Sequence, residues 1–66
     1  MLIMTHDYVY IFEIKRDSTP EMALLQIEEK QYALQYKSDP RKVFLIGLNF
    51  STEKRRLDGY IIKERF

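Results

Sequence analysis

The sequence predicts an α+β fold in which a mixed β-sheet packs against one helix. Residues 8–15 alternate as in a β-strand, a helix-start signal follows at 18–21, and residues 43–50 are apolar on both faces. A strand, a helix and a second strand in this order favour a parallel strand pair with a right-handed helical crossover. With a hairpin at the start and an edge strand at the end, the predicted order is ββαββ.

Length and composition limit the classes of protein to which the chain can belong. Its 66 residues predict a single domain, 1–66, and a domain of this size buries only about 60% of the surface of its unfolded chain. The 11 basic and 10 acidic residues give no overall electrostatic preference for nucleic acid or membranes. The absence of cysteine excludes disulfides and zinc–thiolate sites. No apolar run approaches the roughly 20 residues that span a bilayer, so we expect a cytoplasmic protein without membrane contact.

The first two predicted strands form an antiparallel hairpin. Residues 2–5 and 8–15 flank a turn at His6 and Asp7, and aspartate favours turns. Along 8–15, Glu13 and Lys15 follow two apolar residues on the same face. A carboxylate and an ammonium group side by side at the end of a strand suit a divalent metal and a phosphate. The alternative is that both charges are the solvated end of a half-buried strand.

A helix is predicted from Pro20 to Tyr36 or Lys37. Thr19 can cap a helix whose first residue is proline, or Ser18 can form a capping box with Glu21. The helix should end before Asp39, because a residue that precedes proline is pushed out of the helical region.

Two apolar stripes are expected on this helix. At about 100° per residue, one stripe faces nearly opposite the other. The first contains Ala23, Leu24, Ile27 and Leu34, and the second Met22, Leu25, Tyr32, Ala33 and Tyr36. Because a single sheet covers one stripe, the second is expected to meet another copy of the chain or another domain; the alternative is that its tyrosines tolerate partial exposure. Gln26, beside the first stripe, either reaches the end of the sheet that carries Lys15 or is a surface residue.

The second half of the chain completes the predicted sheet. Residues 43–50 form the central strand, where Gly47 permits close packing under the helix or marks a bulge, and residues 60–64 form an edge strand. Between them, Lys54, Arg55 and Arg56 are candidates for phosphate contacts. We expect Arg41 and Lys42 to assist them, and the alternative is that the whole cluster is a soluble loop.

A resemblance adds to this interpretation. The succession Tyr-Val-Tyr-Ile-Phe-Glu-Ile-Lys, Ala-Leu-Leu-Gln-Ile, Arg-Lys-Val-Phe-Leu-Ile-Gly-Leu-Asn-Phe and Ser-Thr-Glu-Lys-Arg resembles the C-terminal nuclease-type domain of bacterial AAA-ATPase-like proteins, abundant in Bacteroidetes. That domain belongs to the PD-(D/E)XK nuclease superfamily. The similarity covers nearly the whole chain, and it implies a restriction-endonuclease-like core.

The resemblance also implies roles for individual residues. It assigns Glu13 as the acid that holds Mg²⁺, Lys15 as the lysine that positions or activates water, and Gln26 as the helix residue that completes the site. The family's second metal-binding acid, an aspartate, would fall immediately before Met1, and the helix that precedes that aspartate is also lacking. We therefore expect a truncated nuclease-like domain with weak or no catalysis of its own.

Two classes of function follow from the sequence. The first is a fragment of a metal-dependent phosphodiesterase that acts on DNA or RNA. The second is a non-catalytic protein-interaction module that forms a homodimer or higher oligomer through helix 20–36 and exposed core surface.

Overall fold

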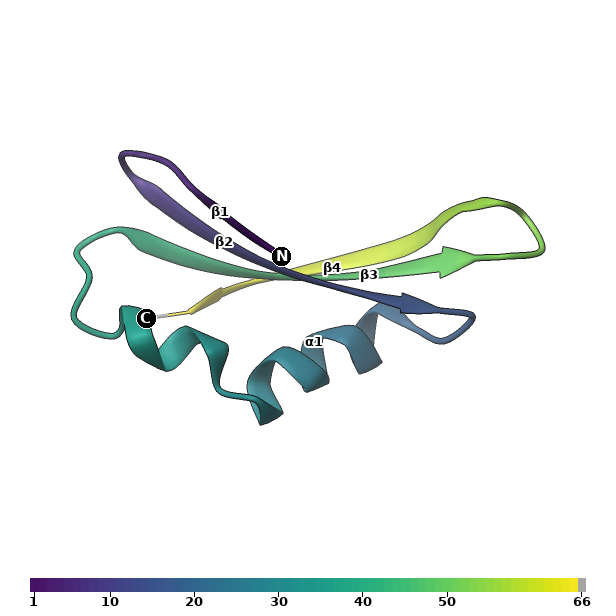
Figure 1. Ribbon diagram of the computed structural model, residues 1–66, viewed down its shortest axis with the longest axis horizontal. Helices are drawn as coiled ribbons and strands as arrows, with labels where there is room; N and C mark the ends of the chain where they lie inside the picture. The colour runs from purple at the N-terminus through teal and green to yellow at the C-terminus, as the bar shows by residue number, and fades with distance from the viewer. Residues whose placement is uncertain (66) are drawn as a thin grey trace.

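The computed structural model describes residues 1–65 as four strands, one α-helix and one short 3₁₀ helix. The predicted ββαββ order and α+β class are confirmed (Figure 1). The largest difference from the predicted bounds is in the last strand, which begins at Arg56, four residues earlier than expected. The elements are β1 (Leu2–Met4), β2 (Tyr8–Arg16), α1 (Pro20–Glu29), η1 (Tyr32–Tyr36), β3 (Lys42–Ser51) and β4 (Arg56–Arg65).

The four strands form one mixed sheet in the order β1-β2-β3-β4. β1 pairs antiparallel with β2, and β3 pairs antiparallel with β4. The central pair, β2 and β3, is parallel, as the sequence predicts. A parallel pair requires a long crossover connection, and α1 and η1 supply it on one side of the sheet (Figure 1).

The hydrophobic core lies between this helical layer and the sheet. Alternate residues of β2 and β3 face the helices, and all of them are buried except Glu13 and Lys15, which are half-buried. The core cluster consists of Val9, Ile11, Ile27, Ala33, Val43 and Leu45, with Ala23 also fully buried. Each large aliphatic side chain in this layer contributes about 1.5–3 kcal/mol through its removal from water.

The N-terminus of α1 forms as the sequence predicts. Thr19 has extended backbone angles, and its Oγ1 accepts a hydrogen bond from the backbone N–H of Met22 at 3.1 Å. Pro20 occupies the first helical turn. A backbone N–H at this position would have no partner within the helix, so proline loses no hydrogen bond there. Of the two predicted caps, the chain therefore uses Thr19.

The predicted continuous helix over 20–36 is wrong. α1 ends at Glu29, and Gln31 has a φ of 55°, in the left-handed region. This residue interrupts the α-helix and resets its periodicity before η1 begins. Ala33 then joins the core, and Tyr36 packs against it, whereas Leu34 is 49% exposed. Because of the break, Ala33 and Tyr36 face the sheet, and Leu34, which was expected to face it, does not.

The opposite side of the sheet carries apolar residues and is not covered by either helix (Figure 1). We call this side the bare face. Strand alternation and register assign to it Tyr8, Tyr10, Phe12, Ile14, Phe44, Ile46, Leu48, Phe50, Leu57, Tyr60 and Ile62. The rings of Tyr8, Tyr10 and Phe44 cluster there, with centroids 5.7 to 5.9 Å apart.

Within residues 1–65, no helix has both the length and the apolar character needed to cross a membrane.

The close approach of α1 to Gly47 gives a first prediction. A Cβ atom at this position would meet the backbone O of Pro20 and would lie 2.9 Å from the backbone N of Leu24. Because both neighbours are backbone atoms, Gly47→Ala forces the helix away from the sheet, and we expect a loss of about 1–3 kcal/mol in the free energy of unfolding. Urea denaturation followed by circular dichroism measures this loss. Glu29→Ala, at an exposed helix position, is the control, and equal stability of the two variants would contradict the packing described here.

Candidate active site

Glu13 and Lys15 lie near the end of β2 on the side that faces the helix. In the parallel register, Glu13 is paired with Gly47 and Lys15 with Asn49. Both share their face with the buried Val9 and Ile11, and both are themselves half-buried. The structure therefore brings the carboxylate and the ammonium group to one face of a strand in the interior of the sheet.

The first turns of α1 pass directly over Gly47, the residue beside Glu13. The lack of a side chain at Gly47 lets the backbone of Pro20 and Leu24 approach the sheet. Because Glu13 is the register partner of Gly47, it occupies the strand position beside the one that the first turns of the helix cover. The position of this glycine therefore determines which part of the helix lies near Glu13.

Gln26 of α1 projects from the flank of the helix nearest β2. The opposite flank carries Glu28, whose Oε1 accepts a hydrogen bond at 2.9 Å from Nζ of Lys63 in β4. At about 100° per residue, Gln26 falls on the other side of the buried Ala23 and Ile27. Among the described residues its Oε1 is buried and has no hydrogen-bond partner. A buried acceptor left unpaired costs about 1–3 kcal/mol, and a ligand that donated to or coordinated this oxygen would remove that cost.

The connection from β2 to α1 is tied to the turn between β3 and β4. Asp17, with a φ of 52°, accepts hydrogen bonds from the backbone N–H of Thr52 at 2.9 Å and from its Oγ1 at 2.7 Å. The backbone N–H of Ser18 donates to Oδ1 of the buried Asn49 at 2.9 Å. These contacts hold the start of α1 against the end of the sheet that carries Lys15.

Sequence reasoning missed the positioning roles of Asp17, Asn49 and Thr52. The capping signal at 18–21 places a helix start there, but it carries no information about a second loop more than 30 residues away. The Thr52 hydrogen bonds lower the pKa of the Asp17 carboxyl below its ordinary value, with the positive charge of Arg16 as a smaller cause.

The predicted basic cluster is divided between the two ends of the sheet. Lys54 and Arg55 lie in the turn after β3 and Arg56 begins β4, at the same end as Lys15, and Lys54 is paired with Asp58 at 3.5 Å. The expectation that Arg41 and Lys42 assist them is wrong. Those two residues lie at the start of β3, and a ten-residue strand is about 30 Å long.

Arg41 and Lys42 are engaged in other contacts at their own end of the sheet. Nη2 of Arg41 lies 2.6 Å from Oδ2 of Asp39, and the hydrogen bonds from Arg41 lower the pKa of that carboxyl to about 2. Nζ of Lys42 lies 3.8 Å from Oε1 of Glu64. These pairs stabilise the loop before β3 and the end of β4.

An open groove of about 510 Å³ adjoins Lys15 at the end of the sheet. It is lined by Ile14, Lys15, Arg16, Phe50 and Leu57. Of these only Lys15 lies on the helix-facing side, so the groove opens mainly on the bare face, on the other side of the sheet from Glu13. Its size lies within the range of about 300–1,000 Å³ typical of sites for small organic ligands, and it combines two cations with an aromatic ring.

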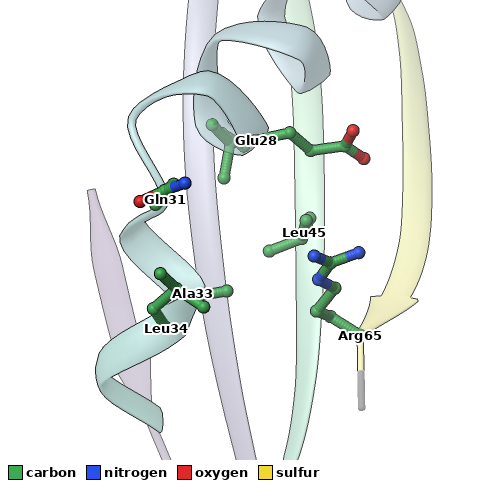
Figure 2. Close-up of a pocket in the computed structure, with 7 residues that line it drawn as sticks. Glu28, Gln31, Ala33, Leu34, Leu45 and Arg65 are labelled. Atoms are coloured by element: carbon green, nitrogen blue, oxygen red, sulfur yellow. The ribbon is translucent and has the colours of Figure 1, made fainter. Parts of the chain in front are cut away.

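A second pocket, under the end of α1, is smaller and contains none of the predicted site residues. Its volume is about 90 Å³, below that of a nucleotide site, and its apolar wall is formed by Ile27, Ala33, Leu34 and Leu45. In Figure 2 the charged ends of Glu28 and Arg65 lie on the same side of this pocket, away from Gln31. The candidate site is therefore the region of Glu13 and Lys15.

The oxygen atoms in this region are of the types that bind a hard divalent cation. Mg²⁺ is bound by carboxylate and carbonyl oxygens, and it commonly uses one or two carboxylates together with water and substrate phosphates. The Glu13 carboxylate and the unpaired Gln26 amide oxygen are donors of these types. No group of three or more His, Cys, Asp or Glu residues within 1–65 is arranged to hold a metal ion. Glu13 and Gln26 can therefore supply part of the ligand set of such an ion, and further ligands are needed to complete it.

The connection between Asp17 and Thr52 gives a prediction about pH. The pKa of Asp17 is lower in the folded chain than in the unfolded chain, so the ionised carboxylate stabilises the fold. This contribution is fully present at pH values above the ordinary pKa of 3.8. This contribution is lost as the pH falls through the folded pKa. We expect Asp17→Asn to be less stable than the wild type at pH 7 and the difference to shrink below about pH 4. Thermal unfolding at a series of pH values measures it.

Thr52→Ala supplies the matched variant for this measurement, because it removes the hydroxyl that donates to Asp17. The two substitutions should be coupled, so that the double variant is less destabilised than the sum of the single variants. Additive effects, or a stability difference that does not change with pH, would contradict the assigned hydrogen bonds.

A family model described as the PD-(D/E)XK nuclease superfamily matches residues 1–59. A relative named "Uncharacterized protein in vnfD 5′region", from Azotobacter chroococcum mcd 1, is 32% identical over 65 residues. The match covers 96% of this chain and 13% of the relative, so the chain spans about one eighth of that protein's length. No solved structure matches the chain.

Proposed function

Because the chain belongs to the PD-(D/E)XK nuclease superfamily, we propose that it is part of a metal-dependent nuclease domain that cleaves phosphodiester bonds in DNA or RNA. The observation that carries this proposal is the position of Glu13 and Lys15, on one face of β2 beside the start of the helix that follows. The family match covers most of the chain, from β1 into β4.

We propose the following roles for the site residues. The Lys15 ammonium binds a phosphate oxygen and orients the attacking water, and Gln26 supplies an oxygen ligand from the helix. The Glu13 carboxylate is the protein's acidic ligand for Mg²⁺. When bound, such a cation polarises the phosphate and lowers the pKa of its water. Lys54, Arg55 and Arg56 contact phosphates further along the nucleic acid, since they lie at the same end of the sheet.

The second acidic ligand is proposed to occupy the position opposite Glu13. Leu2 is paired with Ile11, and the backbone of Met1 exchanges hydrogen bonds with that of Phe12 at 2.8 and 3.0 Å. This register sets the position before Met1 opposite Glu13, where directly opposed Cβ atoms are about 5 Å apart on the same face. An aspartate there would present a second carboxylate to the same cation. Glu13 is the one acidic residue on the helix-facing side of β2 and β3, so residues 1–66 by themselves are proposed to be a weak catalyst.

The length of the relative supports a second part of the proposal. Since this chain corresponds to 13% of that protein, we propose that the domain functions in longer proteins, of which the AAA-ATPase-like proteins suggested by the sequence are one class. A nucleic-acid substrate agrees with the expected cytoplasmic location.

A chain extended by an aspartate placed immediately before Met1 tests the proposal. We expect this chain to cleave plasmid DNA or single-stranded oligonucleotides in Mg²⁺ or Mn²⁺, and Glu13→Ala or Lys15→Ala to reduce the rate by about 100-fold or more. Gel analysis of the products measures the rate. The matched control carries asparagine in place of the added aspartate, which preserves shape and removes charge.

Three outcomes separate the possibilities. Cleavage that depends on the aspartate, on Glu13 and on the metal supports both the function and the opposed carboxylates. Cleavage that is equally fast in the asparagine control supports the nuclease function, but it contradicts the proposal that an aspartate before Met1 is the second acidic ligand. The absence of metal-dependent cleavage in the aspartate chain, or cleavage unaffected by Glu13→Ala, contradicts the nuclease proposal.

A further inference from the structure

Asn49 is a buried polar residue of β3 at the end of the sheet that carries the candidate site. Only 4% of its surface is exposed. In the sheet register it is the partner of Lys15, and both lie on the helix-facing side. Neighbouring strands are about 4.8 Å apart, so the two side chains leave the sheet side by side. A polar side chain buried at this position needs hydrogen-bond partners for both ends of its amide.

The two ends of the Asn49 amide have different surroundings. Its Oδ1 accepts a hydrogen bond at 2.9 Å from the backbone N–H of Ser18, and because a backbone N–H can only donate, this bond fixes which end of the amide is the oxygen. Nδ2 makes no hydrogen bond within residues 1–65. Unlike Oε1 of Gln26, it is not fully enclosed by that part of the chain. The buried side chain therefore presents one oriented, accessible donor.

A β-bulge lies opposite this residue. The register between β3 and β4 shifts between Leu48 and Phe50, so that two residues of β4, Asp58 and Gly59, face the single residue Asn49. Bulges interrupt the ladder of backbone hydrogen bonds, and they occur often beside active sites, where they re-aim a side chain. The irregularity of the sheet thus falls at the position of β3 that carries the oriented amide.

We propose that Asn49 is a further substrate-binding residue, whose Nδ2 donates a hydrogen bond to a phosphate oxygen of the nucleic acid. This inference rests on the nucleic-acid substrate of the proposed function. Nδ2 of Asn49 and Nζ of Lys15 are both donors, and Oδ1 is occupied by Ser18, so the pair matches a group that presents acceptor oxygens. A phosphodiester is such a group, and asparagine side chains commonly donate to phosphates in complexes with nucleic acids.

The hydrogen bond from Ser18 prepares the donor for this role. It holds the amide in one orientation before substrate arrives, so less side-chain freedom is lost on binding. A donor fixed in this way favours a phosphate at one place on the sheet, next to Lys15.

An NMR titration tests the inference directly. Asn49 is the one asparagine of the chain, so labelling this residue type with ¹⁵N gives a single side-chain NH₂ group. The labelled chain is titrated with a single-stranded thymidine hexanucleotide in EDTA, which permits binding without metal-dependent cleavage. We expect one of the two side-chain amide protons to move downfield as it donates to a phosphate. The control is a hexanucleotide with neutral methylphosphonate linkages, which should not produce this shift.

Two variants separate substrate binding from a structural role. Asn49→Ala and Thr52→Ala each remove a side-chain hydrogen bond between the end of the sheet and the connection before α1, but only Asn49→Ala removes the donor. We expect Asn49→Ala to raise the dissociation constant of the hexanucleotide by about tenfold or more, and Thr52→Ala to raise it by about twofold. Fluorescence anisotropy of a labelled hexanucleotide measures both.

The outcomes distinguish this inference from the nuclease proposal. An Asn49 side-chain signal that does not move up to millimolar hexanucleotide, an equal shift with the methylphosphonate control, or equal weakening in the two variants would overturn the inference. A shifted signal together with a lack of cleavage by the aspartate-extended chain supports phosphate binding by Asn49 and contradicts only the nuclease proposal. Metal-dependent cleavage with an unmoved signal overturns the role of Asn49 and leaves the nuclease proposal in place.

Discussion

The contact between the backbone of α1 and Gly47 is the constraint on which the rest of the structure depends. β3 lacks a side chain at this one position, and the carbonyl of Pro20 and the amide of Leu24 occupy the space that a side chain would need. The register partner of this glycine is Glu13. The first turns of the helix therefore lie over the strand position beside Glu13, and Gln26 lies on the β2 flank of the helix. Hydrogen bonds from Ser18 to Asn49 and from Thr52 to Asp17 hold that arrangement from the adjoining loops.

The two sides of the sheet have different chemistry. The side under the helices contains the core and, at one end, the charged and polar groups of the candidate site. The other side carries mainly apolar residues of β2 and β3, with Arg16 and Lys42 at its two ends.

Local sequence patterns predict most of this fold. Alternation identifies β2, a run that is apolar on both faces identifies β3, and Thr19 with Pro20 identifies the start of α1. Each of these signals depends on residues close together in the chain. The break at Gln31 has no such signal: no glycine or proline marks it, and only the packing of Ala33 and Tyr36 on the sheet accounts for it.

Features that join distant segments were the hardest to predict. The separation of Arg41 from Arg55 depends on the length of β3, and the hydrogen bonds between Asp17 and Thr52 depend on two loops that meet only in the folded chain. The pairing of Glu13 with Gly47 likewise depends on the register of two strands that are separated by a helix.

The central claim is that this packing gathers Glu13, Lys15 and Gln26 into one cation-binding region. A titration of the ¹⁵N-labelled chain with Mn²⁺, followed by NMR, tests it most directly, because the paramagnetic ion broadens signals from nearby nuclei. The account predicts that the backbone amides of Glu13 and Lys15 and the side-chain amide of Gln26 broaden first and together. Broadening centred on another carboxylate, such as Glu28 or Asp58, with these three signals unaffected, would contradict it.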